Sequence, residues 1–252
     1  MTGLPDHITT CLFDLDGVVI RTTHLHNAAW ERTCNEFLAG WTAAGGTPVA
    51  PYDPDEDYRL HMDGKPRVDG VRCFLASRGI TLPVGREDDP PGTNTLTGIG
   101  RRKHELSRQL IQEQGVQSYP GSVSYLAAVA GRGLKVGLVT SSGNCEPLLA
   151  AAGLSDVFPV RVDARIAARD GLRGKPHPDT YLAGASRLGS EVEETVVFED
   201  AVVGVEAGRA GRFGYVVGVD RAGRPESLRE RGADVVVSDL AELLASDAPA
   251  RG

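Results

Sequence analysis

The stretch "CLFDLDGVVIRTTHLHNAAW", residues 11–30, begins with the pattern of a strand and continues with that of a helix. Its first apolar run ends at two carboxylates, Asp14 and Asp16, and Gly17 then gives the backbone the freedom for a tight turn. Continuous apolar residues are typical of a strand buried on both faces, as in a parallel sheet. The stretch therefore predicts a central strand with paired carboxylates at its carboxyl end.

Further apolar runs of strand length recur along the chain and alternate with amphipathic helical patterns. Together with residues 9–14, strands are predicted at 134–141, 195–200, 215–220 and 233–239, all buried on both faces, and helices at 122–133, 144–154, 178–189 and 201–211. Alternating strands and helices favour a parallel sheet with helices on both faces. We predict an α/β fold with a doubly wound, Rossmann-like core.

The interval 24–115 has a different pattern. It contains helical stretches and loops rich in turn formers, with no buried strand signal. The helical stretches are 24–41, 70–79 and 101–115, and the loops are 42–57 and 85–98. We predict an α-helical cap domain at 24–115, inserted into a core domain formed by 1–23 and 116–252.

Composition argues against several classes of protein. The chain has 252 residues, 41% of them hydrophobic, which is ample for a sizeable core, and its net charge of -7 with scattered basic residues argues against nucleic-acid binding. The four cysteines form no CxxC pair, so we expect reduced thiols rather than disulfides or a zinc site. No leader pattern or apolar run of membrane-spanning length is present. We expect a cytoplasmic monomer with no membrane partner.

Polar residues cluster where the predicted strands end. The set is Asp14, Asp16, Thr140, Ser141, Ser142, Lys175 in the loop "GKP", Glu199 and Asp200. The carboxyl ends of parallel strands form the ligand-binding edge of such a sheet, so these side chains are expected to converge. Several carboxylates repel one another unless a cation such as Mg²⁺ lies among them. Hydroxyls, helix N–H groups and a lysine suit a phosphate, and an Asp can act as nucleophile or proton carrier.

Each of these signals also has a plain structural explanation. A strand-end Asp is often a turn residue, Ser-Ser often caps a helix, and Glu-Asp before an apolar helix matches the helix dipole. An exposed lysine beside proline is ordinarily a solvated loop residue. The joint occurrence of all four signals, in a sensible chemical combination, favours phosphoryl transfer.

Four motifs carry a family resemblance. "FDLDGVV" (13–19), "VTSSGN" (139–144), "GKPHPDTY" (174–181) and "VFEDAVVGVEAG" (197–208) resemble, in order, the signatures of the haloacid dehalogenase-like phosphotransferase superfamily. Within it the chain most resembles the beta-phosphoglucomutase group, whose helical cap is inserted after the first motif. The resemblance spans nearly the whole chain and implies a Mg²⁺-dependent enzyme acting on a sugar phosphate.

The resemblance also implies roles for the core residues. Asp14 would be the phosphorylated nucleophile, and Asp16 the general acid/base, with its carbonyl oxygen also on Mg²⁺. Glu199 and Asp200 would complete the metal site. The remaining roles are phosphoryl binding by Thr140, Ser141 and Lys175, and sugar-phosphate binding by Ser142 and Asn144.

In the cap, the resemblance assigns substrate contacts to four residues. His26 would approach the acid/base Asp16, Trp30 would line the pocket, Arg67 would bind the distal phosphate, and Lys103 would lie near the sugar. Without the resemblance, His26 would be a packing or capping residue, Trp30 part of the core, and the two cations surface charges.

Two positions depart from the pattern. Arg21 stands where this superfamily often has an acidic residue, and His104 follows Arg102 and Lys103 where relatives have "RKN". Both positions bear on how the cap closes or which sugar phosphate fits.

The acceptor of the phosphoryl group decides the reaction. If a closed cap excludes water and holds a second phosphate, the enzyme is a beta-phosphoglucomutase, with glucose 1,6-bisphosphate as the activating intermediate. With looser closure, water accepts the group and the same residues make a sugar-phosphate phosphatase. The cap residues His26, Arg67 and Lys103 favour the mutase.

Other classes fit less well. A dehalogenase has little use for the second acidic pair, and a phosphoreceiver domain is about half this length and lacks an inserted cap. A non-catalytic sugar-phosphate sensor stays open, although no feature of the sequence favours it.

Overall fold

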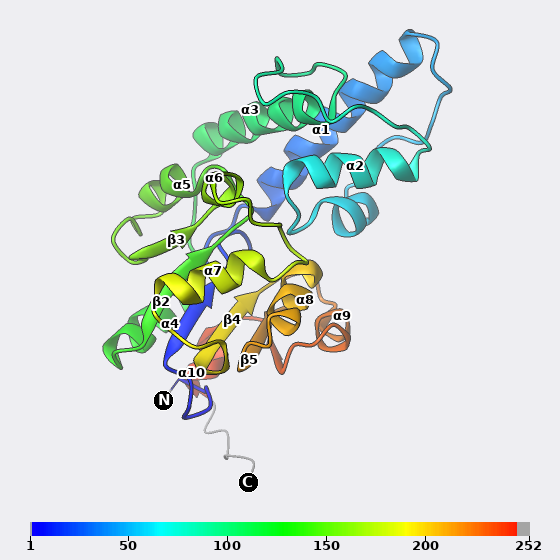
Figure 1. The fold of residues 1–252 in the computed structure, drawn as a ribbon. Coiled ribbons are helices and arrows are strands. Elements are labelled where there is room, and N and C mark those ends of the chain that lie inside the picture. The colour runs from blue at the N-terminus through cyan, green and yellow to red at the C-terminus, as the bar shows by residue number, and fades with distance from the viewer. Residues whose placement is uncertain (1, 246–252) are drawn as a thin grey trace. The chain divides into compact units, whose positions relative to one another are not determined.

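The computed structural model describes residues 2–245, which form two compact units. Unit 1 comprises the chain up to Arg21 and again from Val116 onward, and unit 2 comprises Thr22–Gly115. Figure 1 shows the elements of both units along the chain.

Within the described residues, unit 1 contains a six-stranded sheet in which every neighbouring pair of strands is parallel. The strand order is β3-β2-β1-β4-β5-β6. The strands are β1 (Thr10–Phe13), β2 (Lys135–Val139), β3 (Val160–Val162), β4 (Thr195–Glu199), β5 (Tyr215–Val219) and β6 (Val235–Val237). The order reverses beside β1, where open α/β sheets bind their ligands.

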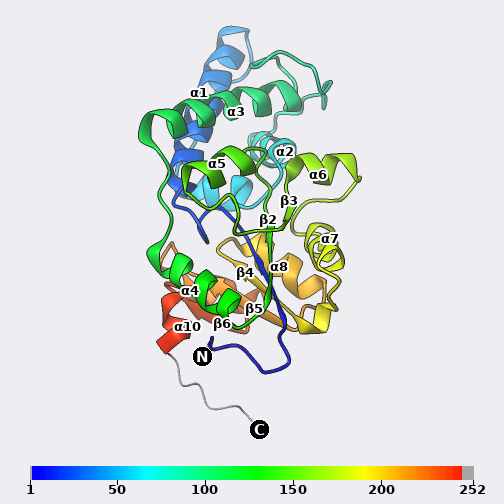
Figure 2. The ribbon, with the colours of Figure 1, turned by 90° about the vertical axis from the view of Figure 1, so that its left-hand side faces the viewer.

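Helices cover both faces of this sheet. Figure 2 shows α4 and α10 on one side of the strands and α7 and α8 on the other. The helices of unit 1 are α4 (Pro120–Gly131), α5 (Cys145–Ala151), α6 (Ala164–Arg169), α7 (Asp179–Arg187), α8 (Val202–Ala210), α9 (Pro225–Glu230), α10 (Ala241–Ala245) and the 3₁₀ turn η2 (Val192–Glu194). The predicted doubly wound parallel sheet is confirmed.

The two edge strands differ from the sequence prediction. β3 was not predicted, because three residues with a central arginine, Val-Arg-Val, are too short to show a pattern. β6 is predicted as buried on both faces, yet Val235 and Val236 are partly exposed. An edge strand has a neighbour on one side only, so less of it is covered.

The centre of unit 1 is an aromatic cluster around Phe13, the last residue of β1. Phe13 stacks on Phe198 with ring centroids 4.3 Å apart, and Tyr125 of α4 meets Phe13 edge to face at 6.4 Å. All three side chains are fully buried. Burial of each such ring stabilises the fold by about 1.5–3 kcal/mol, so the strand ends that precede the site are held rigidly.

Unit 2 is helical, with no strand among its residues, all of which the structure describes. Its elements are α1 (Thr23–Ala43), the π-helical turn η1 (Tyr58–Met62), α2 (Arg67–Ser77) and α3 (Leu96–Gln114). Figure 1 shows α1 and α3 side by side, and Trp30 and Phe74 belong to the buried cluster of this unit. α3 begins earlier than predicted because the Thr95 hydroxyl accepts the N–H of Gly98 at 3.0 Å and caps it.

All four cysteines lie in the described region and are free thiols, as expected. None of the helices within residues 2–245 is long and apolar enough to cross a membrane.

Candidate active site

The strand register sets Asp14 beside Glu199 at the carboxyl edge of the sheet. Phe13 of β1 pairs with Phe198 of β4, so the next residues of both strands lie at the same height. The N–H of Asp14 donates to the carbonyl of Phe198 at 3.0 Å, which continues the ladder by one bond. Two carboxylates are therefore fixed together in a buried place, where their repulsion needs a cation.

Lys175 supplies positive charge there. Its Nζ lies 2.6 Å from Oδ1 of Asp14 and also donates to Oε1 of Glu199. The exposed fractions are 3% for Lys175, 6% for Asp14 and 0% for Glu199. Desolvation raises the cost of breaking such a pair, so this bridge is a strong constraint on the site.

Tyr181 of α7 completes this group. Its hydroxyl donates to Oε1 of Glu199 at 2.7 Å, and its ring centroid lies 5.0 Å from Nζ of Lys175. The backbone N–H of Ala201 donates to the other oxygen of Glu199 at 3.1 Å. Both oxygens of Glu199 thus already accept hydrogen bonds.

Burial and charge act in opposite directions on the ionisable groups. Burial raises the pKa of Asp14 well above its ordinary value, while the ammonium of Lys175 lowers it. Burial by itself would lower the pKa of Lys175, but Asp14 and Glu199 outweigh it, and the pKa is raised. Lys175 is therefore a permanent cation, and its charge opposes the effect of burial on Asp14.

The turn after β1 carries the second aspartate of the opening motif. The carbonyl of Leu15 accepts the N–H groups of Val19 at 2.9 Å and Ile20 at 3.0 Å, which closes the turn around Asp16 and Gly17. Gly17 has φ of +84°, and a Cβ there would lie 1.7 Å from Oδ2 of Asp200. Only glycine fits this position, because the turn passes directly against that carboxylate.

The carboxylates at this edge have the chemistry of a cation site. One oxygen each from Asp14, Glu199 and Asp200 lies within 4.8 Å of the others. Hard oxygen donors of this kind suit Mg²⁺. Because Glu199 already accepts hydrogen bonds from three groups, Asp14 and Asp200 are the better candidates for direct ligands.

The hydroxyl residues follow β2 in a compact loop before α5. Oγ1 of Thr140 accepts the N–H of Ser142 at 3.0 Å, and Oγ of Ser142 accepts the N–H of Asn144 at 3.2 Å. The side chain of Thr140 is 3% exposed. Each hydroxyl uses its oxygen locally, which leaves its own proton to donate to an anion. Ser141 lies between them and is half-buried.

Three of the four predicted cap residues lie together within unit 2. His26 and Trp30 lie one turn apart on α1, and Nζ of Lys103 on α3 lies 2.7 Å from Nδ1 of His26 and 5.0 Å from the Trp30 ring centroid. An ammonium can only donate, so Nδ1 accepts and the imidazole carries its proton on Nε2. Trp30 also belongs to the buried cluster of the unit, so it serves the core as well.

Arg67 is the first residue of α2, and this helix begins three residues before the predicted 70–79. Its Nη1 is 3.4 Å from the carbonyl of Gly100 on α3, and burial lowers its pKa from the ordinary value. A partly buried guanidinium with one long contact to a neutral carbonyl suits an anionic ligand.

Two residues of interest carried no sequence signal. Tyr181 stands in the quoted "GKPHPDTY", but an aromatic residue on a helix indicates packing, and its hydroxyl contact becomes visible only in the fold. Arg221 follows β5 and donates through Nε to the carbonyl of Gly17 at 2.7 Å. Loop arginines are ordinarily surface residues, so no sequence pattern singles this one out.

The structure accounts for the departure at Arg21 but not for the one at His104. The guanidinium carbon of Arg21 lies 4.8 Å from the ring centroid of Tyr119, so a cation–π contact with that ring stabilises its charge. His104 is half-buried on α3 beside Lys103, and nothing in its placement explains the change from Asn.

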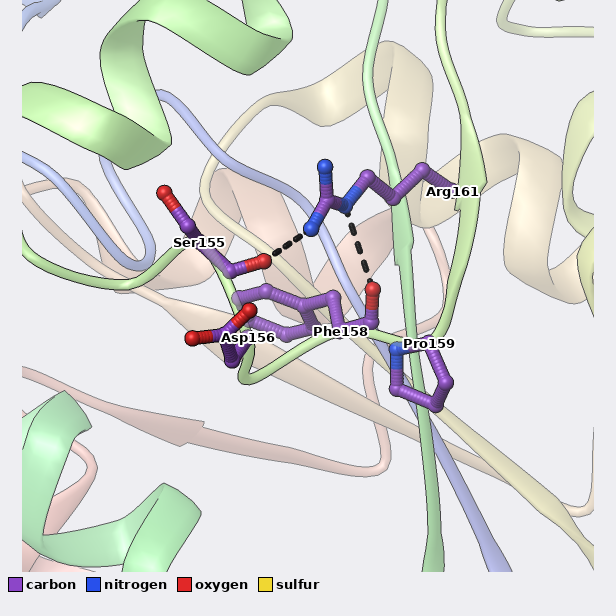
Figure 3. Close-up of a pocket in the computed structure, with 5 residues that line it drawn as sticks. All are labelled: Ser155, Asp156, Phe158, Pro159 and Arg161. Carbon is purple, nitrogen blue, oxygen red and sulfur yellow. Dashed lines mark hydrogen bonds between the residues drawn. The ribbon is translucent and has the colours of Figure 1, made fainter.

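A separate surface hollow of unit 1 lies between α5 and β3 (Figure 3). It is lined by Ser155, Asp156, Phe158, Pro159 and Arg161. Nε of Arg161 donates to the carbonyl of Phe158 at 3.1 Å, and Nη2 donates to that of Ser155. The arginine thus fixes the turn before β3, and this hollow contains no residue of the predicted site.

Comparisons of this chain with known protein families, sequences and structures agree with this architecture. A family model described as haloacid dehalogenase-like hydrolase matches residues 8–212. The chain belongs to the haloacid dehalogenase-like hydrolase family. Beta-phosphoglucomutase of Mycobacterium bovis is 46% identical over 245 residues, covering 96% of this chain and 94% of that protein.

More distant members of the haloacid dehalogenase-like family match over nearly the same length. Hexitol phosphatase A of Escherichia coli is 27% identical over 242 residues, 94% of each chain. The crystal structure of beta-phosphoglucomutase from Clostridium difficile shares the fold, with a TM-score of 0.71, 24% identity and coverage of 94% of this chain and 93% of that one. The protein is therefore a phosphotransferase or phosphatase of the beta-phosphoglucomutase-like group, with an inserted helical cap.

Proposed function

We propose that this enzyme is a beta-phosphoglucomutase that converts beta-glucose 1-phosphate to glucose 6-phosphate through the 1,6-bisphosphate. The observation that carries the proposal is the 46% identity, over 96% of the chain, to a beta-phosphoglucomutase. The buried bridge from Lys175 to Asp14 and Glu199 and the cluster of His26, Trp30 and Lys103 support it.

The proposed chemistry uses the two aspartates of the opening motif. Phosphorylated Asp14 transfers its group to the 6-hydroxyl of the substrate, while Asp16 removes the hydroxyl proton. The bisphosphate then presents its 1-phosphate. A carboxylate oxygen of Asp14 bonds to phosphorus, the bond from phosphorus to the sugar oxygen breaks, and Asp16 returns the proton to that oxygen. Glucose 6-phosphate leaves, and Asp14 is phosphorylated again.

The other residues act on charge and position. We assign Lys175, Thr140 and Ser141 to the transferring phosphoryl oxygens, with Ser142 and Asn144 nearby on the sugar phosphate. Asp14 and Asp200, with the carbonyl of Asp16, would hold Mg²⁺, and Glu199 would serve chiefly to fix Lys175. Mg²⁺ bound there would supply charge neutralisation for phosphoryl transfer.

Residues of unit 2 are proposed to recognise the rest of the substrate. Arg67 binds the phosphate that is not being transferred, and Lys103 and Trp30 contact the sugar. His26 presents its Nε2 proton as a hydrogen-bond donor, because Nδ1 is occupied by Lys103 at 2.7 Å. A substrate with two phosphates requires a cation such as Arg67 for the phosphate that is not transferred, since an unpaired phosphate in a dry site is costly.

A sugar-phosphate phosphatase is the second candidate. The relative named hexitol phosphatase A favours it, because it is 27% identical over 94% of this chain. The two reactions share Asp14 and Asp16 and differ only in whether a sugar hydroxyl or water accepts the phosphoryl group.

One assay separates the two. The enzyme is given beta-glucose 1-phosphate, Mg²⁺ and a trace of glucose 1,6-bisphosphate, and glucose 6-phosphate is measured against inorganic phosphate. The mutase yields mainly glucose 6-phosphate, and mainly free phosphate would refute it. Asp14→Asn is expected to abolish both products.

Arg67→Ala tests the recognition of the second phosphate. Loss of charge-assisted hydrogen bonds should lower mutase kcat/KM by about tenfold to a hundredfold. Hydrolysis of p-nitrophenyl phosphate, which has one phosphate, should change far less. The matched control is Arg72→Ala, an exposed arginine on the same helix. Equal losses in the two assays would contradict the role of Arg67.

A further inference from the structure

Arg221, in the loop after β5, joins three segments of unit 1 that are far apart in sequence. Its Nε donates to the carbonyl of Gly17 at 2.7 Å, and its Nη1 donates to the carbonyl of Ser238 at 2.6 Å. Its guanidinium carbon lies 3.6 Å from the centroid of the Tyr119 ring. The side chain is 17% exposed, so stacking and two hydrogen bonds hold it in one place.

The contact with Gly17 bears directly on the proposed reaction. Asp14 is fixed by the ladder of β1, but Asp16 lies beyond the strand, in the turn that ends at Ile20. That turn is closed by backbone bonds, among them the N–H of Gly17 to the carbonyl of Ile20 at 2.9 Å. Arg221 comes from another part of the fold. Its hydrogen bond to the carbonyl of Gly17 holds the peptide that follows Gly17, one residue beyond Asp16.

Tyr119 provides a rigid platform for that arginine. It lies where the chain re-enters unit 1, and its N–H donates to the carbonyl of Val19 at 3.0 Å, while the N–H of Arg21 donates to the carbonyl of Gln117 at 2.7 Å. The ring is thus tied by backbone bonds to the same segment that leaves the turn. Stacking on it prevents the guanidinium from swinging away from Gly17.

We propose that Arg221 is a positioning residue for phosphoryl transfer, which holds the Asp16–Gly17 turn in its reactive place while stacked on Tyr119. The inference rests on the proposed roles of Asp14 and Asp16. Arg221 acts through the carbonyl of Gly17. Its removal frees the turn, and a proton carrier displaced by about 1 Å can cost about a hundredfold in rate.

The test compares Arg221→Ala with Arg221→Lys and with the control Arg224→Ala, an exposed arginine three residues along. Both p-nitrophenyl phosphate hydrolysis and the mutase reaction are measured, with kcat and KM separated. Arg221→Ala is expected to lose about tenfold to a hundredfold in kcat in both assays, with KM within about twofold. Arg221→Lys should recover part of the loss, because an ammonium can still donate to the carbonyl.

Two readouts separate positioning from plain stability. Guanidinium chloride at low millimolar concentration should restore part of the kcat of Arg221→Ala, and it should leave Arg224→Ala unchanged. The Tm of Arg221→Ala is recorded beside these rates. A lowered Tm with wild-type kcat and no response to guanidinium would overturn the inference.

The remaining outcomes also decide the matter. Wild-type enzyme inactive in both assays would overturn the proposed function and this inference together. Active wild type with Arg221→Ala equal to Arg224→Ala would overturn the inference alone. Should Arg221→Ala fail to fold, Tyr119→Leu and Tyr119→Phe replace it. Loss of kcat in the leucine variant but not in the phenylalanine variant supports the inference, and equal rates overturn it.

Discussion

Replacement of Lys175 by methionine should destabilise unit 1 strongly. Within residues 2–245, Lys175 is the only cation found to bridge the buried carboxylates of Asp14 and Glu199, and the variant lacks it. Opposite charges 2.6 Å apart attract by about 6 kcal/mol at an effective dielectric constant of about 20. Part of that attraction offsets desolvation, and breaking a buried pair by removing one partner costs about 3–5 kcal/mol.

Proton uptake sets an upper limit on this loss. The variant can relieve its two uncompensated carboxylates by protonating one of them. At pH 7 that step costs about 4 kcal/mol for a carboxyl group with an ordinary pKa near 4. The expected loss is therefore about 3–4 kcal/mol at pH 7.

The sign of the pH dependence follows from the same step. The folded variant binds one proton more than its unfolded chain between about pH 5 and 7, so its stability relative to wild type falls as pH rises, by about 1.4 kcal/mol per pH unit. The assay is urea unfolding with EDTA present, followed by circular dichroism at pH 5, 6 and 7. A loss under about 1 kcal/mol at pH 7, or one independent of pH, would refute the reasoning. Lys175→Met combined with Glu199→Gln should recover part of the stability, because one of the two carboxylates is then neutral.

Three further substitutions test other parts of the structure. Gly17→Ala should cost more than Gly133→Ala in urea unfolding, because both positions have positive φ but only the first Cβ would meet a side chain, 1.7 Å away; equal costs would exclude that clash. Tyr181→Phe should cost about 1–3 kcal/mol by removing a buried 2.7 Å hydrogen bond, and a Tm equal to wild type would show that the bond contributes nothing. Asp57→Asn in unit 2 concerns a carboxylate whose pKa, despite the opposing effect of burial, is lowered by its hydrogen bonds with Arg78. The ionised carboxylate of Asp57 stabilises the fold above the unfolded pKa near 4, and this stabilisation is lost as pH falls through the lower folded pKa. The difference in Tm between wild type and Asp57→Asn should therefore shrink from pH 5 to pH 3. A difference that stays constant would argue against this ion pair.

Local pattern was sufficient for the class of fold. A continuous apolar run ending at Asp14 predicts a buried parallel strand, and the alternation after residue 116 predicts the doubly wound sheet. The helical periodicity of 24–115 predicts an inserted helical region. The very short β3 and the turn η1 escaped prediction, because a few residues have too little periodicity to register.

The sequence by itself also predicted that Asp14, Glu199 and Asp200 lie together at one edge of the sheet, since the carboxyl ends of parallel strands share one edge. What only the tertiary structure decided is which group compensates which charge. The order that sets β1 beside β4 places Asp14 next to Glu199, and the loop that carries Lys175 brings its ammonium between them. Such pairings depend on side chains distant in sequence that meet in a dry interior, where the strength of each contact depends on the burial that the whole fold creates.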